Sequence, residues 1–98
     1  MHLSENAVLD AVWQTARETL HVPLARIVVE PWWDWTGTDA LRVTIVIPDS
    51  AAGKIDGEQG LNMLGAVQDR LQRAGEDRFA YIHYATESEL KEDANAEP

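Results

Sequence analysis

Two segments of the chain carry apolar residues at the three- and four-residue spacing of a helix. The first follows Ser4, a good N-cap residue, and must end before Pro23, which cannot continue a helix. The second follows Asp56, with Gln59 in the position of a capping box, and ends at Gly75. The stripes predicted to be buried are Leu9, Val12, Trp13, Ala16 and Leu20 in the first helix and Leu61, Leu64, Val67, Leu71 and Ala74 in the second.

Three other segments, residues 26–35, 41–47 and 79–85, alternate at the period of two that is typical of a strand. The turn-forming cluster at 36–39 joins the first two, so we predict a β-hairpin. Pro31 lacks an N–H and fits at the edge of a sheet or at a bulge. The hairpin residues expected to face the core are Ile27, Val29, Trp33, Trp35, Leu41, Val43, Ile45 and Ile47.

The order of these elements, α-β-β-α-β, predicts an α+β fold of two layers, with a three-stranded sheet and both helices on one of its faces. A right-handed crossover makes the third strand parallel to the second if both lie in the sheet. The pattern leaves open whether the third strand lies beside the first or the second. We expect one domain over residues 1–85, and over 86–98 a short helical turn followed by a disordered acidic tail.

The net negative charge of the chain limits which kinds of molecule it is expected to bind. The 98 residues hold 17 Asp and Glu against 8 Lys and Arg, a net charge of −9, of which −5 falls in residues 1–85 and −4 in residues 86–98. This balance argues against binding to nucleic acids and to anionic membranes, since both rely on Lys and Arg. The absence of cysteine excludes disulfides and thiolate metal sites. Because no targeting segment or long apolar run is present, we expect a cytoplasmic protein.

The sequence contains no nucleophile-elbow, P-loop or dinucleotide-binding motif. The carboxylates at Glu30, Asp34, Asp39 and Asp49 lack the spacing of a known metal-binding motif, and they are typical of a solvated rim. His83 lies in a predicted strand, where a structural role is the simpler interpretation. We therefore expect no enzyme, no catalytic residue, no cofactor and no metal site.

One motif suggests an alternative function. Residues 57–60, Gly-Glu-Gln-Gly, match the GxxG loop of KH-type nucleic-acid-binding domains, whose element order is similar. However, these residues coincide with a predicted helix start, and residues 54–75 carry three bases against three acids. A helix-starting role is favoured, and KH-like binding stays a lesser alternative.

The strongest candidate for a binding residue is Trp32, which alternation places on the sheet face away from the helices. Val28, Val46 and either Tyr84 or Ile82 are expected to share that face, and a patch of this kind usually contacts a partner. The candidate partner-binding residues are Trp32, Glu30, Asp34, Val28, Val46 and Tyr84. The leading hypothesis is a non-catalytic protein–protein interaction module, with a homodimeric structural protein as the alternative.

The segments DALRVTIVIPD, LGAVQDRLQRAGEDRF and YATESEL, within residues 39–90, resemble a group of small, acidic, uncharacterised bacterial proteins. The resemblance covers the last half of the chain and rests on patterns that determine the fold. It implies the antitoxin-like member of a two-gene pair, acting beside a helical partner. It implies no functional residues.

Overall fold

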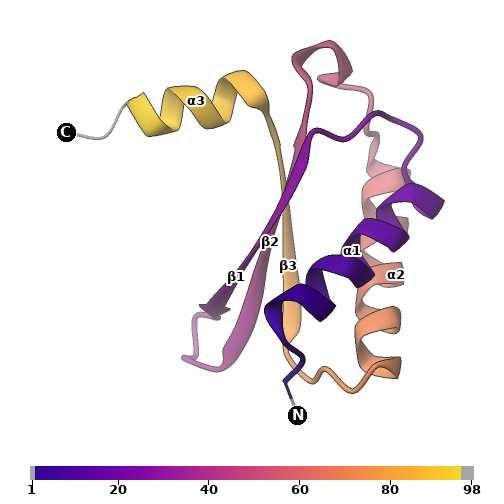
Figure 1. The fold of residues 1–98 in the computed structure, drawn as a ribbon, viewed down its shortest axis with the longest axis vertical. Helices are drawn as coiled ribbons and strands as arrows, with labels where there is room; N and C mark the ends of the chain where they lie inside the picture. The colour runs from indigo at the N-terminus through magenta and orange to yellow at the C-terminus, as the bar shows by residue number, and fades with distance from the viewer. Residues whose placement is uncertain (1, 96–98) are drawn as a thin grey trace.

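The computed structural model describes residues 2–95 of the chain. In chain order its elements are α1 (Glu5–Thr19), β1 (Arg26–Trp33), β2 (Asp39–Ile47), the short 3-10 helix η1 (Asp49–Ala51), α2 (Gly57–Arg73), β3 (Phe79–Thr86) and α3 (Glu87–Asn95). Figure 1 shows them as a sheet with α1 and α2 on one side. The predicted α+β fold, with a three-stranded sheet and two helices packed together against it, is confirmed.

The strand order is β1-β2-β3, so β2 is the central strand. β1 and β2 pair as an antiparallel hairpin, whereas β2 and β3 are parallel, as a right-handed crossover through α2 requires. The neighbour of β3, which the sequence pattern left open, is therefore β2. The apolar composition of β2 suits this position, since seven of its nine residues are buried.

Both helices begin and end where their capping residues predict. The Ser4 side chain accepts a hydrogen bond from the Ala7 N–H at the start of α1, and Asp56 accepts one from the Gln59 N–H at the start of α2. After α2, Gly75 adopts a positive φ of 100°, a conformation that glycine reaches without strain.

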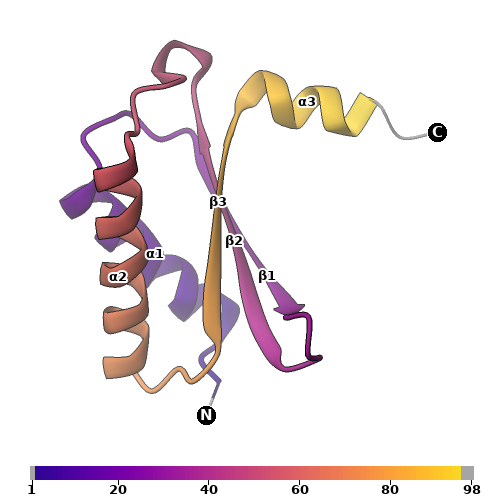
Figure 2. The ribbon, with the colours of Figure 1, turned by 180° about the vertical axis from the view of Figure 1, so that it is seen from behind.

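The buried stripes of the helices differ from the predicted ones. In α1 the core residues are Val8, Val12 and Ala16, while Leu9 and Trp13 are half-buried at the flank. In α2 they are Met63, Val67 and Leu71, while Leu64 is half-buried, Ala74 is exposed and Leu61 is 73% exposed. The two helices lie close together over a sheet of only three strands, as Figure 2 shows from behind. In α1 the smaller side chains therefore face the core and Trp13 lies beside it, whereas in α2 the buried face is rotated from Leu61 and Leu64 to Met63.

The tip of the hairpin extends beyond the helix layer. β1 ends at Trp33, two residues earlier than expected, and Trp33 and Trp35 are 61% and 95% exposed. The prediction that both pack in the core was wrong, because neither helix reaches over this end of the sheet (Figure 1). The carboxylate of Asp34 instead organises the turn, accepting hydrogen bonds from the N–H groups of Thr36 and Thr38.

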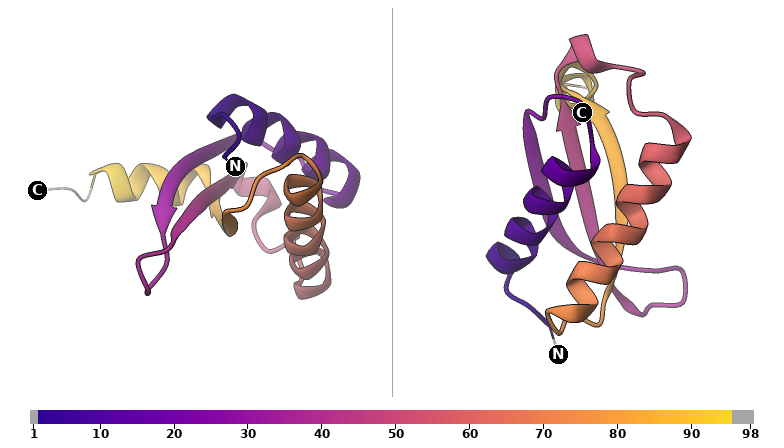
Figure 3. Two further views of the ribbon diagram at one scale, coloured as in Figure 1. Left: turned by 90° about the horizontal axis from the view of Figure 1, so that it is seen from below. Right: turned by 90° about the vertical axis from the view of Figure 1, so that its right-hand side faces the viewer.

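The last helix is longer than the predicted single turn. A capping box begins it, since the Glu89 N–H donates to the Thr86 hydroxyl and the Glu89 carboxylate accepts from the Thr86 N–H. α3 then continues to Asn95, through part of the segment expected to be disordered. Residues 96–98 of that predicted tail lie outside the described residues. Figure 3 shows α3 on the side of the sheet opposite α1 and α2.

A buried ion pair fastens the N-terminus to the loop that precedes β3. The Glu76 side chain is fully buried, and its carboxylate accepts hydrogen bonds from the Arg78 guanidinium at 2.9 Å and from the Leu3 N–H at 2.9 Å. Arg78 also donates to the Leu3 carbonyl. These contacts hold the pKa of Glu76 at about 2, because each favours the ionised carboxylate.

Candidate functional site

The face of the sheet turned away from α1 and α2 is the candidate site, and it is called the open face below. Cross-strand pairing arranges its side chains in four rows. From the hairpin tip toward α3 the rows are Trp32–Ala40–Phe79, Glu30–Arg42–Tyr81, Val28–Thr44–His83 and Arg26–Val46–Ala85. α3 contacts β2 and β3 at the last of these rows.

Three exposed aromatic side chains, Trp32, Phe79 and Tyr81, lie on this face toward its hairpin end. Alternation places Trp33 on the other face, but its exposed ring stacks on that of Trp32, and the four side chains together are here called the aromatic patch. The Trp32 and Trp33 rings stack with centroids 5.2 Å apart, and the Arg42 guanidinium lies 4.9 Å from the centre of the Trp32 ring. Phe79 and Tyr81 meet edge to face at 4.9 Å. These contacts hold the rings in place, so they form a preorganised apolar surface.

Both edges of the sheet carry a feature that discourages strand addition. The Asp34 N–H donates to the Thr38 carbonyl, so the even-numbered residues of β1 are the ones that exchange hydrogen bonds with β2. The backbone groups of the odd-numbered residues point to the outer edge, and one of these residues is Pro31, which has no N–H to offer there. On the other edge the Gln68 side chain of α2 accepts from the Ala80 N–H and donates to the Ala80 carbonyl. The open face is therefore a more accessible surface for a partner than either edge.

Acidic side chains flank the aromatic patch. Glu30 and Asp39 are exposed, and Asp34 lies in the hairpin turn, where hydrogen bonds, chiefly from the Thr36 hydroxyl, lower the pKa of its carboxyl group. The basic groups near these carboxylates are already engaged, since Arg42 is stacked on Trp32, and Arg78, which interacts with Asp39, forms the ion pair with Glu76.

The structure brings together only some of the six predicted binding residues, and Tyr84 is described separately below. Trp32, Glu30 and Val28 lie on the open face as expected, and Val46 shares it but is buried near α3. Asp34 belongs to the turn.

Tyr84 was expected on the open face and lies on the opposite one. The parallel register pairs it with Ile45, whose side chain points into the core, and Tyr84 packs against that core. Burial raises the pKa of its phenol, and within the described residues the hydroxyl oxygen has no hydrogen-bond partner.

Sequence reasoning missed two members of the aromatic patch, Phe79 and Tyr81. Alternation grouped them correctly on one face of β3, but only the pairing with Ala40 and Arg42 of β2 shows which face that is. The motif at residues 57–60 forms the first turn of α2, as the simpler interpretation predicted, and not a loop between two helices.

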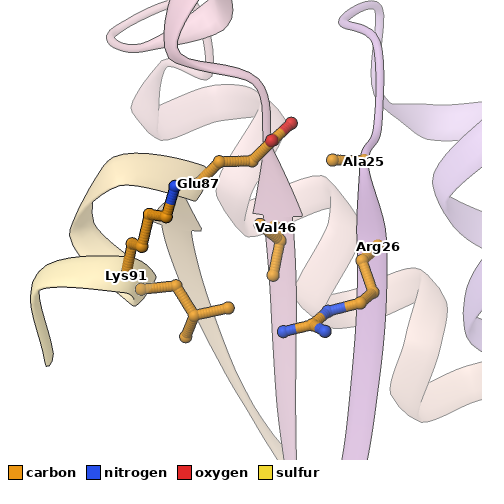
Figure 4. A pocket seen from close by; sticks show the side chains of 6 residues that line it. Ala25, Arg26, Val46, Glu87 and Lys91 are labelled. Carbon is orange, nitrogen blue, oxygen red and sulfur yellow. The ribbon is translucent and has the colours of Figure 1, made fainter. Parts of the chain in front are cut away.

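A groove of about 480 Å³ lies at the other end of the open face, between α3 and the first two strands. The described residues that line it are Ala25, Arg26, Val46, Glu87, Leu90 and Lys91. Figure 4 shows Arg26 and Val46 side by side on adjacent strands, with Glu87 and Lys91 on the wall formed by α3. It is called the α3 groove below.

One cluster has atoms close enough to suggest a metal site: His2, Glu76 and Asp77. The residues do not fit a cation. Both oxygens of Glu76 already accept hydrogen bonds from Arg78, and the positive charge of that guanidinium would repel a metal ion bound there. His2 pairs with Asp77 at 3.3 Å.

Comparison with known proteins adds no relative: no family model, curated protein or solved structure matches this chain. Among the helices of residues 2–95, none combines the length and apolar character needed to cross a membrane.

Proposed function

We propose that this protein is a non-catalytic interaction module that binds another protein through the aromatic patch. The observation that carries the proposal is the joint exposure of four aromatic rings at the hairpin end of the sheet, which no helix covers: Trp32, Phe79 and Tyr81 on the open face, and Trp33 stacked on Trp32. Tryptophan and tyrosine are enriched among residues that dominate binding energy, and clustered exposed apolar side chains mark interaction sites. Because the rings are already fixed by stacking, binding requires little further ordering of side chains.

The partner surface that fits the patch is apolar at its centre and basic at its rim. Glu30 is exposed in the row of the open face next to Trp32, Asp39 is exposed opposite Trp33 at the hairpin end, and Arg42 is held by Trp32. The chain as a whole carries −9, which favours encounter with a positively charged protein. An inhibitor or antitoxin-like role, in which this chain covers a basic surface of a second protein, is the form of the function that agrees with the resemblance to small acidic bacterial proteins.

The test compares capture of partners by the full-length protein and by matched variants. Trp32→Ala removes the centre of the patch, and its control is Leu61→Ala, which removes an even more exposed apolar side chain from α2, 73% against 38%. Glu30→Lys reverses a charge beside the patch, and its control is Asp10→Lys on α1. A captured protein is then purified, and its dissociation constant is measured by calorimetry at two salt concentrations.

We expect the two patch variants to weaken binding at least tenfold and the two controls to leave it unchanged, with melting temperatures near that of the wild type. Added salt is expected to weaken binding by the wild type. Equal binding by all four variants would refute the proposal. Analytical ultracentrifugation tests the alternative of a homodimer. If the wild type were a dimer and Trp32→Ala a monomer, the partner at the patch would be a second copy of this chain and not another protein.

A further inference from the structure

The α3 groove combines an apolar floor with cationic walls. Val46 is buried at its base, and Leu90 and Ala25 add apolar surface. Arg26 and Lys91 are both exposed and stand on different elements, β1 and α3. Among the lining residues whose side chains the structure describes, Glu87 is the single acidic one, so these residues sum to +1 in a chain that carries −9.

Arg26 and Lys91 differ from most basic residues of this protein in having no acidic or aromatic partner among the described residues. Of the eight basic residues, five are engaged: Arg17 and Arg42 lie over tryptophan rings, and Arg70, Arg73 and Arg78 form ion pairs with acidic residues. Among residues 2–95, three have no ion pair within 4.0 Å and no aromatic partner, and they are Arg26, Lys54 and Lys91. Two of those three line the same groove, although acidic residues outnumber basic ones about twofold.

We propose that the α3 groove binds the C-terminal residue of a polypeptide, with its free carboxylate between Arg26 and Lys91 and an apolar side chain against Val46 and Leu90. A guanidinium can hold a carboxylate by two parallel hydrogen bonds, and the ammonium group adds a second positive charge. A chain end fits because it joins a carboxylate and an apolar side chain at one Cα. An acidic side chain would need a second residue to supply the apolar contact.

The position and size of the groove favour a polypeptide end over a free small molecule. Its volume of about 480 Å³ suffices for one or two residues, but it opens along the side of α3, whereas small-molecule sites enclose most of their ligand. The rest of a bound chain has a path along the open face toward the aromatic patch. The groove nevertheless uses none of the residues of that patch, so the two sites can be tested separately.

The test uses the full-length protein and an acetylated hexapeptide, Gly-Ser-Gly-Ala-Leu-Val, prepared as the free acid and as the C-terminal amide. Binding is followed by backbone amide chemical shifts of the protein during titration. We expect the free acid to move the signals of Arg26, Val46 and Leu90, and the amide to bind at least tenfold more weakly. Arg26→Gln and Lys91→Gln are each expected to weaken binding of the acid about tenfold, as loss of a charged hydrogen bond does.

Lys54→Gln is the matched control, because it removes the third unengaged cation, which lies outside the groove. Both Lys54→Gln and Trp32→Ala are expected to bind the acid like the wild type. Equal binding of acid and amide, or equal binding by the Arg26 and Lys91 variants, would overturn the inference. If the peptide titration gave such a result while Trp32→Ala still weakened binding of the captured partner, the aromatic patch would stand as the binding site without the α3 groove. The two proposals can therefore fail separately.

Discussion

The carboxylate of Asp49 accepts hydrogen bonds from both the backbone N–H and the hydroxyl group of Ser88, 39 residues later in the chain. Ser88 lies in the first turn of α3, whose N–H groups have no partners within the helix. Asp49, at the start of η1, therefore caps a helix that belongs to the other end of the chain. This contact, together with the Thr86–Glu89 capping box, sets the direction in which α3 leaves the sheet.

Removing this cap is expected to loosen α3 without unfolding the domain. In Asp49→Ala the Ser88 N–H loses its acceptor, so amide hydrogen exchange of residues 87–91 should accelerate while exchange in β2 stays unchanged. The control is Asp10→Ala, an exposed acidic residue on α1. Unchanged exchange at Ser88 in the Asp49 variant would show that α3 is held by other contacts.

The buried Glu76 carboxylate is expected to be the most sensitive charged position of the fold. Glu76→Ala leaves the Arg78 guanidinium, itself largely buried, and the Leu3 N–H without their acceptor. Loss of one partner of a buried ion pair costs about 3–5 kcal/mol, a large share of the roughly 5–15 kcal/mol that stabilises a domain. Urea denaturation measures the change in the free energy of unfolding.

Two further variants keep that measurement interpretable. Glu76→Gln retains an acceptor oxygen and should fall between wild type and Glu76→Ala. Asp69→Ala breaks the exposed ion pair with Arg73 and should change stability by less than about 1 kcal/mol. If the Asp69 and Glu76 variants lost similar amounts, the buried pair would be no more important than a surface one.

The lowered pKa of Glu76 predicts how stability depends on pH. Its pKa is about 2 in the folded protein and 4.5 as the ordinary value, so between these values the unfolded state binds more protons and stability rises with pH. The contribution of this carboxylate is present above about pH 4.5 and is lost as pH falls toward 2. Melting temperatures measured from pH 5 to 2 should fall less steeply in Glu76→Gln, and identical slopes would contradict the assignment.

The helix cores offer a direct test of burial. Met63 is fully buried in α2, so Met63→Ala should lower the free energy of unfolding by about 2–5 kcal/mol, whereas Leu61→Ala should change it by less than about 0.5 kcal/mol. Denaturant titration of the two variants distinguishes the observed stripe from the predicted one. A larger loss at Leu61 would place that residue, not Met63, in the core.

The fold was largely predictable, and the errors share a physical cause. Alternation located the hairpin because each strand has one face on the core, and the capping residues located the helix ends. Periodicity alone specifies a helix face only to within a residue, so the choice between Leu61 and Met63 required knowing what packs there. In the same way, Trp33 lies on the predicted face, but no helix extends far enough to cover it.

The candidate site was predictable only in part. Trp32 and Glu30 were found from alternation within one hairpin, where local pairing sets the face. Tyr84 was misplaced because the register of β3 against β2 depends on a crossover of 31 residues between Ile47 and Phe79, which no local pattern specifies. The α3 groove likewise brings Arg26 and Lys91 together from distant parts of the chain.

The Gln68 side chain is expected to keep the β3 edge closed. In Gln68→Ala the Ala80 N–H and carbonyl lose both partners, which should cost about 1–3 kcal/mol and expose an edge that can pair with another chain. Thermal denaturation and light scattering at rising protein concentration measure the two effects. The control is Gln72→Ala on the same helix, and a monomeric, equally stable Gln68 variant would contradict the expectation.

The contact between Leu3 and Glu76 also orders events during synthesis. The first turn of α1 is made early, but Glu76, whose carboxylate accepts the hydrogen bond from the Leu3 N–H just before that turn, is made 73 residues after Leu3. Until then Val8 and Val12 lack both α2 and the completed sheet as packing partners. Docking of α1 is therefore complete only after α2 and the loop that precedes β3 have been made, and until then its apolar face is exposed to association with other chains.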